Sequence, residues 1–218
     1  MKGVFDMIPV LIIGKSGAGK SASLRNLPTM GTVVVNVLGK PLPFRSDLDV
    51  IYCDDYNKIA ASIARGQFER CIIDDAGYLI TNHFMRNHAE TGTGNAVYQL
   101  YNDLADRYWN LVRTIQTTPG TARVYLMMHE EKNDMGDVKP KTIGRLLDEK
   151  VCLEGMFTIC LRAIVNNGKH VFRTTSDGFD TAKSPMGMFT DDEIDNDLAA
   201  VDDAIVDYYK IGGGSENE

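Results

Sequence analysis

The sequence predicts an α/β fold with a mostly parallel central sheet flanked by helices, followed by antiparallel strands in its last third. The first observation is the alternation of β-branched runs with helical patterns between residues 8 and 128. The second is a glycine-rich segment directly after the first apolar run. The third is an Asn-Asn-Gly turn signal between two apolar runs near the C-terminus. We expect one domain, with a core at residues 1–189, an acidic helix at 190–209 and a flexible tail at 210–218.

The elements follow in order from hydrophobic periodicity. Strands of the parallel sheet are expected at residues 8–13, 32–37, 50–53, 70–74 and 123–128. Helices are expected at residues 22–27, 56–65 and 96–117. Residues 157–165 and 170–175 read as a hairpin, and Thr190 with Glu193 forms the capping box of the acidic helix. Polar residues 90–95 and the charged residues 129–142 are expected to be mobile loops, serving either as solvated connectors or as segments that respond to a ligand or partner.

The glycine-rich segment has the pattern G-x-x-x-x-G-K-[ST] between a strand and a helix, which is typical of the phosphate-binding loop of nucleoside triphosphatases. In such a loop the backbone N–H groups and the helix N-terminus face the phosphates. Lys20 is expected to reach the β- and γ-phosphates and the Ser21 hydroxyl to bind Mg²⁺. The expected nucleotide-binding residues are Gly14, Lys15, Ser16, Gly17, Ala18, Gly19, Lys20 and Ser21.

Two acidic residues end the apolar run at residues 70–74. Asp74 is the expected Mg²⁺ carboxylate, acting through water, and Asp75 is the expected residue that orients or deprotonates the attacking water. His129, with Glu130 behind it, follows the strand at 123–128 and is a candidate for sensing the γ-phosphate, although a simple polar strand end fits almost as well.

A small basic cluster follows in the charged loop and just after it. Its residues could contact the phosphates of DNA, or the γ-phosphate across a subunit interface, or could be solvated loop charges. The three residues are Lys139, Lys141 and Arg145.

Composition limits the choice of partners and compartment. The net charge of −7 disfavours a surface that is basic everywhere, so nucleic-acid binding would need a local basic channel. The four cysteines lack C-x-x-C spacing, which is typical of reduced thiols, and no signal-peptide or membrane-spanning pattern is present. We therefore expect a cytoplasmic protein without membrane contact.

The motifs LIIGKSGAGKS, CIIDDAG and MMHEE, in this order, and more loosely KPKTIGRLL, resemble those of small RecA-like P-loop ATPases of bacteriophages. Such proteins are often described as AAA-family ATP-binding proteins and are related to single-strand annealing recombinases. The resemblance covers about residues 7–189. It implies a RecA-like core, ATP and Mg²⁺ binding, and a role in phage DNA recombination or replication in the host cytoplasm. Binding of single-stranded DNA beside a single-strand-binding protein, and assembly into a homo-oligomeric ring or filament, are implied too.

The chain departs from this resemblance after the second strand, where RecA-like enzymes usually carry a catalytic glutamate. Residues 35–40 (VNVLGK) contain no acid. Either Asp75 activates water, or hydrolysis is slow and ATP acts mainly as a conformational ligand; Lys40 could face a phosphate or a neighbouring subunit. Two further readings stay open, a nucleotide-switched interaction module with little turnover and a small-molecule (nucleotide) kinase with residues 129–142 as its lid.

Overall fold

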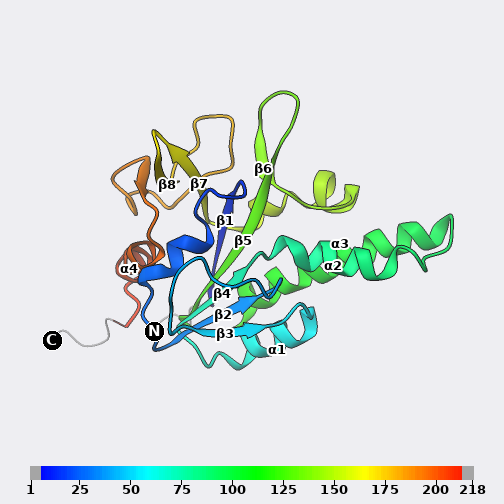
Figure 1. Cartoon of the computed structure of the whole chain (residues 1–218), viewed down its shortest axis with the longest axis horizontal. Helices are drawn as coiled ribbons and strands as arrows, with labels where there is room; N and C mark the ends of the chain where they lie inside the picture. The colour runs from blue at the N-terminus through cyan, green and yellow to red at the C-terminus, as the bar shows by residue number, and fades with distance from the viewer. Residues whose placement is uncertain (1–5, 213–218) are drawn as a thin grey trace.

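A sheet of nine strands forms the centre of the computed structural model, which describes residues 6–212 (Figure 1). The strands are β1 (Ile8–Gly14), β2 (Thr32–Asn36), β3 (Asp49–Tyr52), β4 (Arg70–Asp74), β5 (Arg123–Lys132), β6 (Val138–Pro140), β7 (Ile159–Asn166), β8 (Lys169–Arg173) and β9 (Glu193–Asp195). The α-helices are α1 (Tyr56–Arg65), α2 (Gly77–Asn87), α3 (Asn95–Thr117) and α4 (Leu198–Tyr209). Short helical segments are η1 (Ser21–Asn26), η2 (Leu146–Lys150) and η3 (Leu153–Met156).

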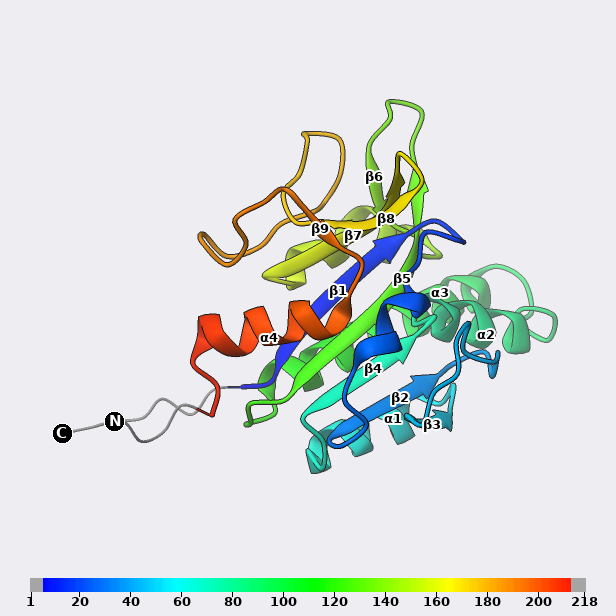
Figure 2. The ribbon, with the colours of Figure 1, turned by 60° about the vertical axis from the view of Figure 1, so that its left-hand side comes forward.

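The strand order explains how distant motifs come together. It runs β3-β2-β4-β5-β1-β7-β8-β9, with β6 paired to the end of β5 (Figure 2). Neighbours from β3 to β7 are parallel, whereas the β7–β8, β8–β9 and β5–β6 pairs are antiparallel. The predicted α/β class with a mostly parallel sheet and C-terminal antiparallel strands is therefore confirmed. Because parallel strands share one carboxyl edge, the ends of β1, β2, β4 and β5 lie at the same edge of the sheet.

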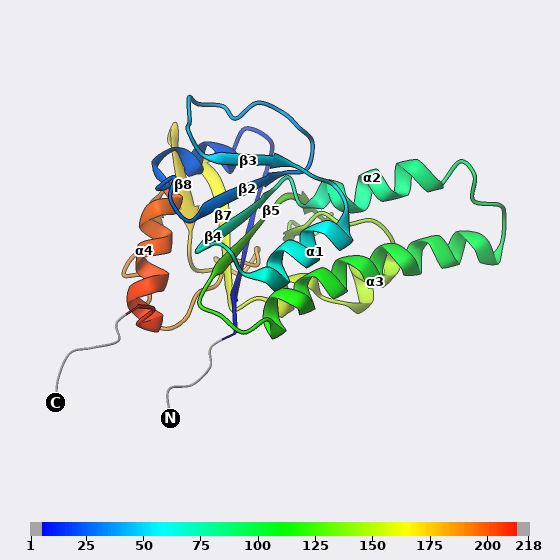
Figure 3. The ribbon, with the colours of Figure 1, turned by 90° about the horizontal axis from the view of Figure 1, so that it is seen from below.

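Alternating side chains of the strands build a core on each face of the sheet. One face packs against α1, α2 and α3 through residues such as Leu11, Ile73 and Leu126. The other face packs against η1 and α4 through Ile12 and Ile72. Figure 3 shows α4 on the opposite side of the sheet from α1 and α3.

A buried carboxylate attaches α4 to the amino-terminal ends of β4 and β5. Asp202 accepts hydrogen bonds from Arg70 Nε at 2.6 Å, from Arg123 Nε and Nη2 at 2.8 Å each, and from the Tyr125 hydroxyl at 2.5 Å. Burial alone would raise the pKa of Asp202, but the bonds from Arg123 and Tyr125 outweigh it and hold the pKa below its usual value. The helix is thus joined to β4 and β5 by one side chain.

Two expected elements differ from the structure, and a third is confirmed. The charged segment 129–142 is not one loop, because β5 continues to Lys132 and pairs with β6, which leaves only a short turn at 133–137. The helix expected at 22–27 is the six-residue 3₁₀ helix η1, so its dipole is weaker than that of a full α-helix. The hairpin at residues 157–175 is confirmed, with Asn167 and Gly168 both at positive φ in its turn.

The prediction of a continuous acidic helix over 190–209 is wrong in its first part. Residues 193–195 form β9, which pairs with β8, and α4 begins only after Asp197, whose side chain accepts the Ala199 N–H. Glu193 therefore does not close a capping box, since its carboxylate binds Arg173 and Asn166 across the strands. Residues 210–212 are a turn, and the rest of the expected tail lies outside the described residues.

Two further findings bear on the expected environment. None of the four cysteines forms a disulfide; Cys71 and Cys160 are buried, whereas Cys152 is exposed. Within residues 6–212, no helix combines the length and apolar character needed to cross a membrane.

Candidate nucleotide site at the glycine-rich loop

The loop at residues 14–21 leaves the carboxyl end of β1 in a conformation that depends on its glycines. A Cβ on Gly14 would lie 2.6 Å from the carbonyl oxygen of Ala163 in β7, too close for any other residue. Gly17 and Gly19 have φ values of 79° and 98°, which favour glycine. The loop is thus shaped both by its own backbone and by the neighbouring strand.

Lys20 is buried on the inner side of this loop. Its ammonium donates to the carbonyl oxygens of Gly14 at 2.7 Å and Lys15 at 3.0 Å. Burial lowers the pKa of Lys20, against the opposing effect of Asp75 and Asp74. A positive charge is therefore held at the centre of the loop, close to the backbone that would surround a phosphate.

Ser21 and Asp74 meet as the sequence predicts, although they come from different elements. The Ser21 hydroxyl donates to Asp74 Oδ1 at 3.0 Å, and the same oxygen accepts the Asp75 N–H at 3.1 Å. Burial raises the pKa of Asp74, and the adjacent Asp75 adds to this effect. A hydroxyl beside a carboxylate suits Mg²⁺, which commonly binds one or two protein oxygens together with phosphates and water.

Over the described part of the chain, no group of three or more His, Cys, Asp and Glu residues is arranged to hold a metal ion. Ser21 and Asp74 supply two oxygen ligands of the kind that Mg²⁺ takes.

Asp75 follows the metal-site carboxylate in a strained conformation. Its φ is 60°, a left-handed value that a non-glycine residue adopts at some energetic cost. Its side chain is only 6% exposed and forms an ion pair with Lys40 Nζ at 2.5 Å, while His129 Nε2 lies 3.7 Å from its other oxygen. The hydrogen bond to Asp75 raises the pKa of Lys40. Asp75 is thus positioned between a flexible cation and an imidazole.

His129 lies level with Gly14 because β5 pairs directly with β1. Its ring makes an edge contact with Tyr78 at 5.8 Å between ring centroids. Burial, followed by the charge of Lys20, lowers the pKa of His129, so the imidazole is neutral at neutral pH. The structure thus places this candidate beside the loop and beside Asp75.

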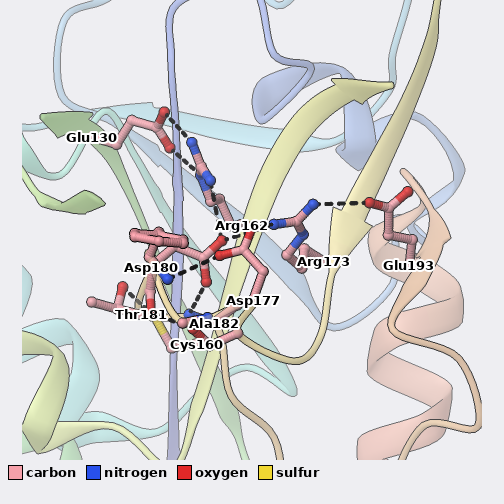
Figure 4. A network of polar contacts seen from close by, with 12 residues as sticks. Glu130, Cys160, Arg162, Arg173, Asp177, Asp180, Thr181, Ala182 and Glu193 are labelled. Atoms are coloured by element: carbon pink, nitrogen blue, oxygen red, sulfur yellow. Dashed lines mark hydrogen bonds and ion pairs between the residues drawn. The ribbon is translucent and has the colours of Figure 1, made fainter. Parts of the chain in front are cut away.

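Glu130 points into a different network from His129. Both of its oxygens accept hydrogen bonds from Arg162, at 2.8 and 3.0 Å, and Arg162 also binds the fully buried Asp180 (Figure 4). The bond to Glu130 is the largest of the effects that raise the pKa of Arg162. Arg173 extends the network to Glu193 on β9. Glu130 therefore ties β5 to the C-terminal strands, and its carboxylate is already occupied by an arginine.

The three basic residues expected to act together are not joined in one patch. Lys139 forms an ion pair with Glu131 at 3.2 Å, and Arg145, 90% exposed, lies 3.6 Å from Glu149. Lys141 lines a cavity beside the loop. Only Lys141 of the three is thus placed next to the candidate site.

Two cavities adjoin the loop and share Ser16 and His129. One, of about 300 Å³, is lined by the loop together with Lys40, Pro43, Asp75, His129 and His170. The other, of about 460 Å³, opens on the α2 side and is lined by Lys15, Ser16, Gly77, Tyr78, Thr81, His129, Glu130, Lys141, Thr142 and Ile143. The arrangement offers two adjoining spaces beside the loop, each lined in part by lysine side chains.

Sequence reasoning missed the residues that support the loop from the C-terminal strands. His170 Nδ1 lies 3.1 Å from the carbonyl oxygen of Ala18, and a Cβ on Gly19 would lie 3.0 Å from both His170 Nδ1 and Asn196 Oδ1. These contacts join residues far apart in the sequence, and neither residue belongs to a local motif. The ion pair between Lys40 and Asp75 was missed for the same reason.

A scan against protein-family models finds no match to this chain, and a search among curated protein sequences finds none either.

Proposed function

We propose that this chain is a RecA-like P-loop protein that binds ATP with Mg²⁺ and hydrolyses it. The observation that carries the proposal is the convergence of Lys20, the Ser21–Asp74 pair, Asp75 and His129 at the carboxyl edge of β1, β4 and β5. Phosphoryl transfer needs little covalent chemistry from a protein, so a cation, a metal-holding pair and a water-orienting acid account for most of what is required.

Each residue has a distinct part in this proposal. The N–H groups of the loop and the Lys20 ammonium hold the β- and γ-phosphates and offset the charge that develops on them. Ser21 and Asp74 hold Mg²⁺, which neutralises phosphate charge when bound. Asp75 accepts the proton of the attacking water, and neutral His129 orients the γ-phosphate or that water by hydrogen bonding.

We further propose single-stranded DNA as the partner that ATP binding regulates, in phage recombination or replication. The cavity beside the loop supports this proposal, because Lys15 and Lys141 line it and their ammonium groups could bind a backbone phosphate. A single-strand-binding protein and further copies of the chain, as a ring or filament, belong to the same proposal.

A second candidate is a nucleotide-switched interaction module with little turnover. One specific observation favours it. Among the described site residues, Asp75 is the only acid next to Asp74, and it forms an ion pair with Lys40. The nucleotide-kinase alternative, which shares the fold and the phosphate loop, is less favoured, because the expected lid at 129–142 is largely the paired β5–β6 hairpin.

The test is ATP turnover with and without single-stranded DNA, together with equilibrium binding of ATP and ADP. Lys20→Ala is expected to reduce turnover by about 10²-fold or more, since electrostatic stabilisation dominates this chemistry. Lys58→Ala, an exposed lysine of α1, is the matched control and should leave turnover unchanged.

The outcomes separate the candidates. Lys20-dependent hydrolysis stimulated by DNA supports the recombination ATPase. Tight ATP binding with negligible turnover and no DNA response supports the interaction module. Wild-type turnover in Lys20→Ala would overturn the proposed mechanism.

A further inference from the structure

Lys40 lies in the segment between β2 and β3, and its side chain reaches the candidate site at Asp75. Its side chain is 59% exposed, so the ammonium can move, whereas its partner Asp75 is buried. Both residues line the same cavity as Lys20 and Ser21. The exposed Lys40 ammonium thus lies beside Asp75 in the cavity where a terminal phosphate would be bound.

The backbone of Lys40 is fixed by the residue at the end of β2. The Asn36 side chain donates to the carbonyl oxygen of Lys40 at 2.5 Å and accepts the Gly39 N–H at 2.7 Å. Gly39 turns at a φ of 68°, and the Tyr52 ring packs within 3.1 Å of where its Cβ would lie. Asn36 is also level with Asp74 in the sheet. The strand end that lacks an acid therefore carries an amide that positions Lys40.

The negative charges around the cavity favour a second cation close to Asp75. Asp74 and Asp75 are adjacent buried acids, and a γ-phosphate held by Lys20 would add further negative charge a few ångströms from Asp75. Unless a second cation lies between them, the carboxylate and the phosphate would repel each other. Lys40 is the lysine that contacts Asp75, and it lines the same cavity.

We propose that Lys40 is a sensor of the terminal phosphate, with an ammonium that binds either the Asp75 carboxylate or the γ-phosphate of ATP. When a triphosphate is bound, Lys40 contacts its γ-phosphate and Asp75 becomes free to accept the proton of water. When a diphosphate is bound, Lys40 stays on Asp75 and blocks it. This inference rests on the proposed function. It means that Lys40, a residue of the same chain, discriminates between ATP and ADP.

The test compares affinities rather than rates alone. A non-hydrolysable ATP analogue and ADP are titrated against wild type, Lys40→Ala, Lys40→Arg and the control Lys58→Ala. Lys40→Ala should lose about tenfold or more in affinity for the ATP analogue, the effect of removing one charge-assisted hydrogen bond, while its affinity for ADP stays within about twofold. Lys40→Arg should retain most of the preference for the ATP analogue. Hydrolysis by Lys40→Ala should fall together with that preference.

A second variant examines the positioning of Lys40. Asn36→Ala removes both hydrogen bonds to the turn but keeps the ammonium, so it should reduce the preference for the ATP analogue less than Lys40→Ala does. An Asn36→Ala protein with the full wild-type preference would overturn the role given to Asn36.

Two results would overturn the inference while leaving the proposed function intact. One is an unchanged ratio of ATP-analogue to ADP affinity in Lys40→Ala. The other is faster hydrolysis by Lys40→Ala, which would mean that Lys40 only masks Asp75. If wild type binds neither nucleotide, or if Lys20→Ala hydrolyses ATP at the wild-type rate, the proposed function fails and the sensor role fails with it.

Discussion

Replacing Asp202 by asparagine should lower the free energy of unfolding by about 3–5 kcal/mol, the usual effect of breaking a buried ion pair. The variant keeps the size of the side chain but removes the charge that faces two arginines. Arg123 is buried, and its remaining partner is the carbonyl oxygen of Thr121 at 3.1 Å. Arg70 retains Glu69 at 3.0 Å, so most of the effect comes from Arg123.

The assay is urea unfolding of Asp202→Asn and of Asp203→Asn, a neighbouring exposed position on α4 that serves as the control. Because the folded pKa of Asp202 is held below its usual 3.8, its contribution is fully present above that pH and is lost as the pH falls through the lower folded value. The difference between the two variants should therefore shrink in acid. A difference below about 1 kcal/mol at pH 7 would refute the view that this carboxylate attaches α4 to the sheet.

Three further predictions concern the site. Gly14→Ala should cost about 1–3 kcal/mol of stability, since its Cβ would press on the Ala163 carbonyl; an unchanged urea midpoint would contradict this. Asp74→Asn keeps an acceptor for Ser21 but loses its charge, so Mg²⁺ titrations of nucleotide binding should show a loss of about tenfold to hundredfold in metal affinity, and equal affinity would argue against the metal role. His129 has a folded pKa below its usual 6.5, so the unfolded chain binds more protons and wild type should lose stability as the pH falls below 6.5. His129→Gln should lose less stability than wild type between pH 7.5 and 5.5. Equal losses of stability in urea unfolding would show that burial of the imidazole does not matter.

The sequence predicts those parts of the fold and site that depend on local patterns. Gly14, Asp74 and His129 each come at the end of an apolar run, and parallel pairing of the strands then brings these three positions to one edge of the sheet. The meeting of Ser21 with Asp74 could be predicted in this way.

Competition between local and long-range interactions explains the errors. Thr190 and Glu193 have the spacing of a capping box, but pairing with β8 and the ion pair to Arg173 draw Glu193 into a strand. The charged residues after His129 read as a loop, yet β6 provides partners for their backbone. The contact of Lys40 with Asp75 depends on a turn fixed from β2, which no short pattern reveals.

The contacts of His170 in β8 and of Asn196, just after β9, with the glycine-rich loop have a consequence for when the loop is completed during synthesis. Ala18 and its partner His170 are separated by 152 positions, and Asn196 lies further on still. At about 5–20 residues per second, a ribosome needs roughly 8–30 seconds to add the intervening chain. During that time β1 and its loop exist without the strands that support them. The loop, although it is synthesised early, acquires its final neighbours late, so a nascent chain that stops before Asn196 lacks contacts that support the loop even when β1, β4 and β5 are already present.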